Sequence, residues 1–293
     1  PTHGRSLVEA AMRITALADN ERLDARKDLE KEWGVSLHVA HARGSLLFDT
    51  GPSGKFADNA AKLGIDVAAI DTAVLSHGHS DHGGGLLRFF EANTHAPVLA
   101  RREVRETPLF ARILGIPLPI GLDARVFGEH ASRMRLVEGD SEPNEGLHLV
   151  TTIPRRHPAP RFNRILYRRE NGRLVPDDFR HELVMALEEE DGLVVFTGCS
   201  HHGVLDMVEA VKDALPGKRL KGLVGGFHLA GLPPFDASGE KKADVERLAR
   251  ALEALGLPRI VTGHCTGKRA FGILRSLLGD RVEYLATGAS VTI

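Results

Sequence analysis

Three histidines and an aspartate lie within six consecutive positions of this 293-residue sequence. Residues 76–82 read Ser-His-Gly-His-Ser-Asp-His, and three glycines follow them. Imidazole and carboxylate groups together suit divalent metals such as zinc, iron, manganese or cobalt. The apolar residues 72–75 directly before this segment predict a buried strand. The sequence therefore predicts half of a metal site at the edge of a sheet, and a polar surface loop is the alternative.

Three later histidines share a second pattern. His201, His228 and His264 each follow an apolar, strand-like run and stand beside glycine, in the segments Thr-Gly-Cys-Ser-His-His-Gly (197–203), Gly-Gly-Phe-His-Leu (225–229) and Gly-His-Cys-Thr-Gly (263–267). Glycine lets the backbone approach a ligand closely or adopt positive φ. Each histidine alone would be taken for a surface or capping residue. The repetition predicts His201 and His264 as metal ligands and leaves His228 open between metal ligand, substrate contact and a residue that orients a ligand.

The first segment resembles the signature of the metallo-β-lactamase superfamily, a large group of mostly dinuclear metal hydrolases. With the three later segments, and with residues 17–20 and 47–51, the sequence resembles one branch of it. That branch comprises the 7,8-dihydropterin-6-yl-methyl-4-(β-D-ribofuranosyl)aminobenzene 5′-phosphate synthase-like metal-dependent hydrolases. The resemblance covers most of the chain outside its proline-rich centre, and it implies an αββα sandwich.

The resemblance also implies a role for each position of the segments. The implied ligands are His77, His79 and His201 for a first metal, and Asp81, His82 and His264 for a second. Metal-bound imidazoles usually donate their other N–H to a carboxylate or carbonyl. Asp49 of the 47–51 segment would orient the metal site in this way, and a simple turn aspartate is the alternative. Asp81 and His228 are the candidate catalytic residues.

Cys199 marks a departure from the wider superfamily. Many members have Gly-Asp after this strand, and the aspartate bridges the two metals, whereas this chain has Gly198-Cys199. Cys199 could bridge as a thiolate, which is a good soft ligand. It could also be a buried bystander, which is the commoner fate of a cysteine, or the bridge could be absent. Cys265, directly after His264, is expected to be a packing residue.

Two metals about 3.5–4 Å apart can hold a hydroxide and a substrate oxygen together, and they lower the pKa of bound water toward about 7. No serine or cysteine nucleophile is then needed, and the sequence has no Gly-x-Ser-x-Gly elbow or P-loop. We predict two divalent metals, with zinc favoured and manganese or iron as alternatives. The predicted reaction is attack of metal-bound hydroxide on an ester, with a phosphoester first, as in phosphodiesterases.

Phosphate is suggested by the ribose phosphate that the resembling branch handles and by a basic stretch. Arg155 and Arg156, followed by His157, Arg161 and Arg164, add positive charge to the proline-rich centre. Arginine binds phosphate oxygens bidentately. We therefore predict that Arg155, Arg156 and His228 contact a small anionic, phosphorylated substrate. Solvated surface arginines are the alternative.

Three rival functions remain open. The first is a synthase-type transferase, which would join a pterin precursor to a ribosylaminobenzene phosphate and release pyrophosphate. The second is a di-iron redox protein, which usually has a carboxylate in the place of His79 and a flavin partner domain. The third is a non-catalytic metal-binding module, whose structural zinc would be closed by four ligands.

Composition sets the broad class. The chain is 42% hydrophobic and 26% charged, with a net charge of −1, as in ordinary soluble globular proteins. No apolar run approaches the ~18 residues of a membrane span, and no charge bias favours membrane surfaces or nucleic acid. No signal peptide is visible, although the sequence begins at Pro1. Two cysteines make no disulfide framework, so a cytoplasmic location is expected. The oligomeric state is not predicted.

The elements that must position these residues alternate between strands and helices. After a helical start, we predict strands over 12–18, 35–42, 45–49 and 71–76, with helices over 21–33, 56–63 and 85–92. The later half predicts strands over 193–196, 220–225, 259–262 and 288–293, with helices over 205–215, 244–255 and 271–278. Prolines crowd residues 101–165 and predict short strands in an inserted or lid-like segment. Overall we predict one domain over 1–293, of the α/β (α+β) class, as a four-layer αββα sandwich.

Overall fold

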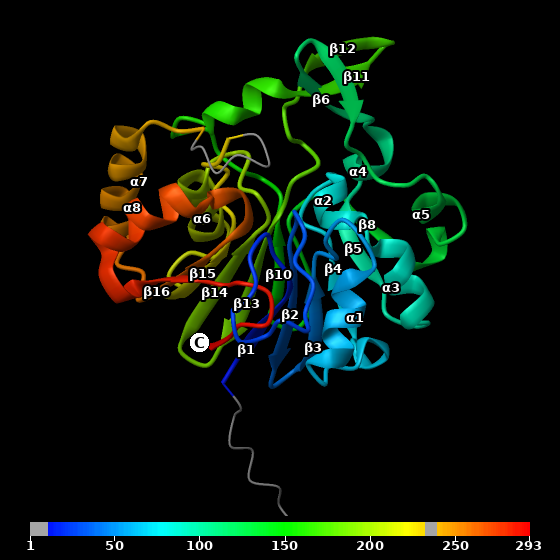
Figure 1. Cartoon of the computed structure of the whole chain (residues 1–293), viewed down its shortest axis with the longest axis horizontal. Helices are drawn as coiled ribbons and strands as arrows, with labels where there is room; N and C mark the ends of the chain where they lie inside the picture. Colours follow the sequence, from blue (N-terminus) through cyan, green and yellow to red (C-terminus); the bar gives the residue numbers. More distant parts are fainter. Residues whose placement is uncertain (1–10, 232–238) are drawn as a thin grey trace, which may run out of the picture.

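A computed structural model describes residues 11–231 and 239–293 of the chain. Two seven-stranded sheets pack face to face, and helices cover the outer face of each (Figure 1). The predicted four-layer sandwich is confirmed. The helical start predicted for the N-terminus lies in residues 1–10, outside the described residues.

The first sheet combines an antiparallel half with a parallel half. In spatial order its strands are β18 (Ser290–Thr292), β1 (Arg13–Ala18), β2 (Ser36–His41), β3 (Gly44–Phe48), β4 (Thr72–Val74), β5 (Val98–Arg101) and β8 (Met134–Val137). The pairs from β3 to β8 are parallel. β1 and β3 both pair antiparallel with β2. The carboxyl ends of β1, β3, β4 and β5 therefore lie at one edge of the sheet.

The second sheet has the same mixed character. Its strands, in spatial order, are β17 (Val282–Tyr284), β16 (Arg259–Thr262), β15 (Leu220–Gly225), β14 (Gly192–Thr197), β13 (Val184–Glu189), β10 (Leu147–Val150) and β9 (Ser141–Asn144). The pairs from β14 to β17 are parallel. β14 is apolar on both faces because Val194 and Phe196 pack against the first sheet while Leu193 and Val195 pack under helices.

Helices close both outer faces. They are α1 (Lys55–Lys62), α2 (Ser80–Gly83), α3 (Leu86–Ala92), α4 (Glu103–Glu106), α5 (Arg125–Gly128), α6 (Val204–Ala214), α7 (Lys242–Ala254) and α8 (Lys268–Leu278). Phe56 of α1 and Phe89 of α3 are buried against the first sheet. Met207 of α6, Ala249 of α7 and Leu274 of α8 are buried over the second. None of the helices in the described ranges combines the length and apolar character needed to cross a membrane.

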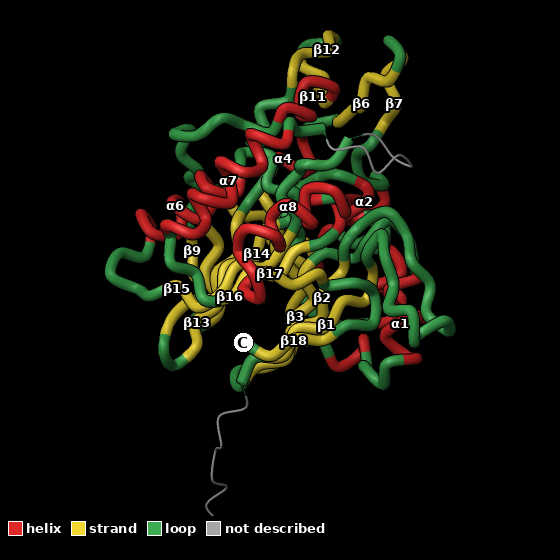
Figure 2. The backbone as a smooth tube through the Cα atoms, turned by 60° about the vertical axis from the view of Figure 1, so that its left-hand side comes forward, coloured by secondary structure: helices red, strands yellow, loops and turns green. Residues whose placement is uncertain are grey.

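A small third sheet stands over one end of the sandwich (Figure 1, Figure 2). It is antiparallel, and its strands are β12 (Arg173–Pro176), β11 (Leu166–Glu170), β6 (Leu109–Ile113) and β7 (Ile116–Pro119). The proline-rich segment 101–165 thus supplies β6 and β7 to this sheet and β8 to β10 to the two main sheets. Its role as a lid stays a prediction.

One predicted helix is wrong. Residues 21–33 form turns and a single bridge from Arg22 to Thr287. Leu29 is the one fully buried residue of that stretch, so a helix would have no apolar face to bury. The Arg22 guanidinium instead donates to the carbonyl oxygen of Leu29 at 2.7 Å. The other predicted helices and strands within the described residues are confirmed, with small shifts at their ends. The strands β5, β13 and β17, the third sheet and the short helices α2, α4 and α5 were not predicted.

Candidate metal centre

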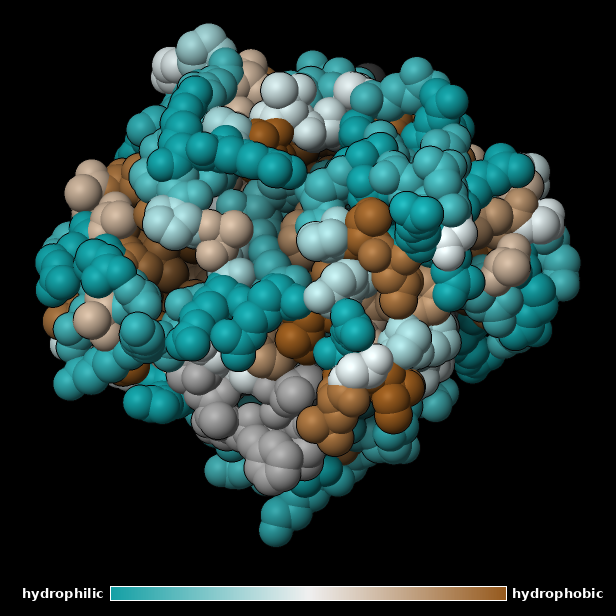
Figure 3. Space-filling view, turned by 90° about the horizontal axis from the view of Figure 1, so that it is seen from above, coloured by the Kyte–Doolittle hydropathy of each residue, from teal (hydrophilic) through white to brown (hydrophobic). Residues whose placement is uncertain are grey.

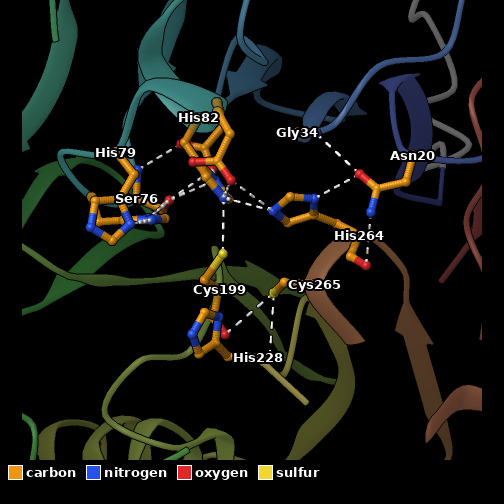
Figure 4. Close-up of polar contacts among 12 residues, drawn as sticks. Asn20, Gly34, Ser76, His79, His82, Cys199, His228, His264 and Cys265 are labelled. Carbon is orange, nitrogen blue, oxygen red and sulfur yellow. Dashed lines mark hydrogen bonds and ion pairs between the residues drawn. The ribbon is translucent and has the colours of Figure 1, made fainter. Parts of the chain in front are cut away.

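The histidine segments meet at the end of the sandwich where parallel strands terminate. Residues 76–82 follow β4, Cys199 and His201 follow β14, His228 follows β15, and His264 follows β16. Because these strands run in parallel within each sheet, their carboxyl ends lie at a common edge. Figure 4 shows side chains from both sheets pointing toward one another there.

His77, His79 and His201 form one group. Nε2 of His77 lies 3.0 Å from Nδ1 of His79, and the His201 ring lies 5.0 and 4.8 Å from their rings, centroid to centroid. Asn163 Nδ2 donates to the carbonyl oxygen of His201, so the Asn163 Oδ1 is the atom that faces Nδ1 of His201, at 3.0 Å. An amide oxygen only accepts. Nδ1 of His201 therefore carries the proton, and its Nε2 presents a lone pair.

Asp81, His82 and His264 form the other group. Nε2 of His82 lies 3.2 Å from Nε2 of His264 (Figure 4). Oδ2 of Asp81 lies 3.3 Å from the same His264 nitrogen. Asp49 Oδ2 accepts from Nδ1 of His82 at 2.6 Å. Asn20 Oδ1 accepts from Nδ1 of His264 at 3.0 Å, and its amide nitrogen donates to the carbonyl oxygen of His264. Both imidazoles thus turn an Nε2 lone pair toward the same point.

These separations fit metal ligands. Four ligand atoms at 2.0–2.1 Å around a tetrahedral metal lie roughly 3.3 Å from one another. Two lone pairs facing each other at 3.2 Å, as in His82 and His264, repel unless a cation lies between them. Nε2 of His79 and Nε2 of His201 are buried and have no hydrogen-bond partner. Unpaired buried nitrogens are costly unless something binds them, so the donor set fits divalent metals.

Burial keeps the first group neutral. It lowers the pKa of His79 to about 3 and the pKa values of His77 and His201 well below the usual range. Neutral imidazole is the form that binds metal. Burial alone would raise the pKa of Asp81, but His82 and His264 beside it hold that pKa well below the usual range. The first group therefore offers neutral nitrogens, and Asp81 offers an ionised carboxylate. Burial would also lower the pKa of His264, but Cys265 and Asp81 raise it to about 9, so a metal that binds His264 would displace a proton from it.

A cavity of about 250 Å³ opens directly over these groups. Its lining combines metal-site residues with an apolar wall from the third sheet: Trp33, His79, Ser80, Asp81, Ala111, Ile113, Ile120, Phe162, Ile165, Leu166, Cys199, His201, His228, Ala230, Gly231 and Cys265. A substrate in this cavity would contact both the histidine groups and the third sheet.

The sequence model of the metallo-β-lactamase superfamily matches residues 34–264. The chain belongs to the metallo-β-lactamase superfamily. A curated relative in Methanocaldococcus jannaschii, a 7,8-dihydropterin-6-methyl-4-(β-D-ribofuranosyl)-aminobenzene-5′-phosphate synthase, is 30% identical over 259 residues, which is 83% of this chain and 82% of the relative. The resemblance to this branch is confirmed.

Solved structures agree. The crystal structure of a metal-dependent hydrolase of the β-lactamase superfamily has a TM-score of 0.78 and 30% identity, covering 96% of this chain and 99% of its own. The Zn²⁺-bound protein PqqB of Methylobacterium extorquens, at 13% identity, covers 96% of this chain and 100% of its own with a TM-score of 0.59, which shows the shared fold.

Cys199 occupies the place where many superfamily members have an aspartate. Its Sγ lies 3.1 Å from Nε2 of His82. The same sulfur is within 4.8 Å of the ligand atoms of Asp81, His82 and His264, and equally of those of His77 and His201. Burial raises the pKa of its thiol, so binding as a thiolate would release a proton to solvent. Cys199 is thus the residue that both groups share.

His228 lies beside the first group without belonging to it. Its ring is 4.3 Å from that of His201, centroid to centroid, and both ring nitrogens are buried without a hydrogen-bond partner. Its φ of 50° places it in the left-handed region, which costs a non-glycine residue free energy. The backbone N–H of His228 donates to Sγ of Cys265 at 3.3 Å. His228 is also one of the residues that line the cavity that a substrate would enter.

Residues 177–183 contact the first group of the candidate metal centre. This segment was not identified from the sequence. Nδ1 of His181 accepts from the N–H of Gly78 at 3.1 Å, and its Nε2 contacts Asp177 Oδ2 at 3.0 Å. The Phe179 ring stacks on the His201 ring at 4.5 Å and 4°. The bond to Gly78 holds the turn between His77 and His79, and the Phe179 ring packs against a proposed ligand of the first group.

The same segment reaches the second sheet through Glu182. This buried carboxylate accepts from the backbone N–H groups of His201 and His202, at 2.8 and 3.0 Å. The sequence signal was a run of titratable side chains, Asp177, His181 and Glu182, directly before an apolar strand. Both ring nitrogens of His181 have hydrogen-bond partners. His181 therefore positions the residues around it and has no free nitrogen for a metal.

Arg155 and Arg156 lie outside the cavity. Arg156 is an exposed residue whose guanidinium forms ion pairs with Glu209 and Asp213 of α6, and Arg155 donates to the carbonyl oxygen of Asp178 at 3.2 Å. Neither residue is among those that line the cavity, and the same holds for Arg161 and Arg164. Phosphate binding by Arg155 and Arg156 stays a prediction.

Proposed function

We propose that this chain is a metal-dependent hydrolase of esters, with phosphodiesters as the preferred class and two divalent metals in its centre. The proposed ligands are His77, His79 and His201 for one metal and Asp81, His82 and His264 for the other. Zinc suits this nitrogen-rich set, and manganese and iron are alternatives. When bound, such metals supply a hydroxide nucleophile at neutral pH and polarise the ester oxygen.

The observation that carries this proposal is the orientation of the imidazoles. In His82, His201 and His264 the Nδ1 atom faces a fixed oxygen acceptor, and Nε2 is left toward the centre. Such fixed orientation by outer partners is typical of metal-binding histidines. Cys199, common to both groups, is our candidate for the bridge between the metals. The open cavity above the groups argues against a closed structural site.

Two residues have proposed catalytic roles beside the metals. Asp81 lines the cavity, and its Oδ2 is held 3.3 Å from Nε2 of His264. This carboxylate can orient the attacking water and accept its hydrogen bond. His228 has two free ring nitrogens at the cavity wall. Either nitrogen can donate a hydrogen bond to the leaving-group oxygen, which would stabilise the charge that develops there.

Metal analysis tests the proposal. The purified chain should hold close to two divalent metals, and His79→Ala should lose metal and activity together. His148→Ala is the matched control, because His148 is a buried histidine that pairs with Glu188 and lines no part of the cavity. The assay should cover bis-p-nitrophenyl phosphate, lactones, thioesters and β-lactams. Full activity in metal-free protein would overturn the proposal.

A synthase-type transferase is the second candidate, because the Methanocaldococcus relative named as a synthase is 30% identical over 83% of this chain. A transferase would turn over only when both co-substrates are present. A hydrolase would turn over a single ester in water. Assays of each ester alone and of paired substrates with the same metal-loaded preparation separate the two functions.

A further inference from the structure

We propose that the third sheet selects the substrate, which is an ester with one negative charge and a bulky apolar group that lies against β6 and β11. This inference rests on the proposed function and narrows its substrate class. It concerns the apolar residues that the third sheet adds to the cavity lining, whereas the proposed function concerns the metal-site residues beneath them.

The wall is apolar because β6 alternates. Ala111 and Ile113 line the cavity, while Arg112 between them is exposed. Ile165, directly before β11, and Leu166, its first residue, continue the same surface. Figure 3 views the molecule from this end and shows apolar side chains, in brown, set among hydrophilic ones. An apolar group on this wall would be removed from water, which favours binding in proportion to the apolar area that is buried.

Aromatic rings flank the metal groups at both ends of the cavity. The Trp33 ring lies 5.4 Å from that of His264, and the Phe162 ring lies 6.2 Å from that of His228, centroid to centroid. Trp33 is 37% exposed although it is large and apolar. An aromatic ring left partly in water beside a candidate active centre is suited to cover an apolar group of a ligand.

The charge of the lining limits the charge of the substrate. Among the described residues that line the cavity there is no lysine or arginine, and Asp81 adds negative charge. A dianionic phosphomonoester is normally held by arginine forks or lysine. The guanidinium of Arg156 is committed to Glu209 and Asp213 instead. A monoanionic diester, whose charge the metals alone can balance, fits this lining better.

The volume limits the size of the apolar group. The cavity holds about 250 Å³, whereas a cavity of about 150 Å³ accepts a benzene molecule. There is room for one ring-sized group together with the ester. Larger substrates would extend into solvent past the hairpin of β6 and β7.

The test compares two diesters with the same leaving group, p-nitrophenyl phenyl phosphate and p-nitrophenyl methyl phosphate. For each ester, kcat/KM with metal-loaded protein is divided by the rate constant of its uncatalysed hydrolysis in alkaline solution. The resulting value for the phenyl ester should exceed that for the methyl ester by about tenfold. Ile113→Ala should reduce this ratio severalfold. Ile116→Ala is the matched control: Ile116 is the Cα partner of Ile113 in the hairpin, is 61% exposed and does not line the cavity. It should leave the ratio unchanged.

A second variant tests the charge limit. Ile113→Arg should raise kcat/KM for p-nitrophenyl phosphate, a dianion, relative to the phenyl diester. Hydrolysis of both diesters with a ratio near one, or equal effects of Ile113→Ala and Ile116→Ala, would overturn the inference while leaving the proposed function intact.

Equilibrium binding keeps the two proposals separable. Methyl phenylphosphonate should bind the metal-loaded protein more tightly than methyl methylphosphonate, and Ile113→Ala should narrow that difference. If no ester is hydrolysed but this preference holds, the proposed function fails and the apolar wall stands. If neither ligand is preferred, the inference about the wall fails.

Discussion

Asn163 holds His201 by two hydrogen bonds that decide which ring nitrogen faces the cavity. Its amide nitrogen donates to the carbonyl oxygen of His201 at 2.7 Å, and its amide oxygen accepts from Nδ1 at 3.0 Å. Asn20 repeats the arrangement on His264, at 3.1 and 3.0 Å. Each half of the centre thus has one asparagine that fixes one histidine, although the two asparagines come from unrelated parts of the chain.

Asn163→Ala should weaken metal binding at one site, and Asn20→Ala at the other. Loss of an outer partner of a metal-binding histidine typically costs about 10- to 100-fold in metal affinity. Titration with a chelator that competes for metal would resolve two dissociation constants per chain. We expect a different one of the two to rise in each variant. Equal loss of both metals in both variants would mean that the asparagines support the fold rather than individual histidines.

Asp49 should tune the other side of the centre. Its carboxylate accepts from Nδ1 of His82 at 2.6 Å and from the N–H and Oγ of Ser76, both at 2.7 Å. Its φ is 59°, a conformation that asparagine tolerates. Asp49→Asn therefore removes charge without backbone strain, and it should lower metal affinity by about 10- to 100-fold.

The measurement for Asp49→Asn is metal affinity by chelator competition, with the thermal stability of the metal-free protein recorded beside it. Asp66→Asn is the control, since Asp66 is an exposed aspartate that caps a short 3₁₀ helix through the N–H of Ala68. It should leave metal affinity as in the wild type. Unchanged affinity in Asp49→Asn would show that His82 keeps its orientation without the carboxylate.

Sequence reasoning located the residues whose evidence is local. His77 to His82, His201 and His264 stand directly after apolar runs and beside glycine, and the strands before them are confirmed. The arginines illustrate the limit. The positive charge of Arg156 is visible in the sequence, but its partners Glu209 and Asp213 are 53 and 57 residues away. Only the fold shows that this guanidinium pairs with their carboxylates.

The supports of the centre were missed for the same reason. Asn163 lies in the proline-rich stretch, where no periodic pattern exists, and it acts on a histidine 38 residues later. His181 acts on Gly78 across 103 residues. The wrong helix over 21–33 had a charged surface pattern, but its backbone is bound by contacts with Asn59 and Thr287. Contacts between distant segments override local propensity here.

Cys199 should bind metal as a thiolate if it bridges the two groups. In protein loaded with cobalt(II), a thiolate ligand gives a ligand-to-metal charge-transfer band in the near ultraviolet. We expect this band in the wild type and in Cys265→Ala, and we expect its loss in Cys199→Ala. Both thiols are buried at 3% exposure, so Cys265 controls for a general effect of removing a sulfur. Persistence of the band in Cys199→Ala would assign the thiolate elsewhere, and its absence from the wild type would make Cys199 a bystander.

Gly198 follows β14 directly and lies close to Ser76 and His77 of the first segment. A Cβ there would lie 2.1 Å from Oγ of Ser76 and 2.9 Å from Nδ1 of His77. Gly198→Ala must therefore displace the Ser76 hydroxyl and the His77 ring. It should destabilise the metal-free protein by about 1–3 kcal/mol through overpacking. Metal binds the folded state, so it adds RT ln(1 + [L]/Kd) to stability. Because the variant binds metal more weakly, that increment should shrink as well.

Gly272→Ala provides the contrast, because Gly272 lies in α8 and a Cβ there meets nothing within 4 Å. This exposed helical glycine should gain about 0.5–1 kcal/mol on substitution by alanine. Its metal-dependent increment should equal that of the wild type. Urea unfolding of the wild type and both variants, with and without metal, gives the change in stability and the metal-dependent increment of each variant. A Gly198→Ala protein that is destabilised but keeps the full increment would show that Ser76 and His77 recover their positions once metal is bound.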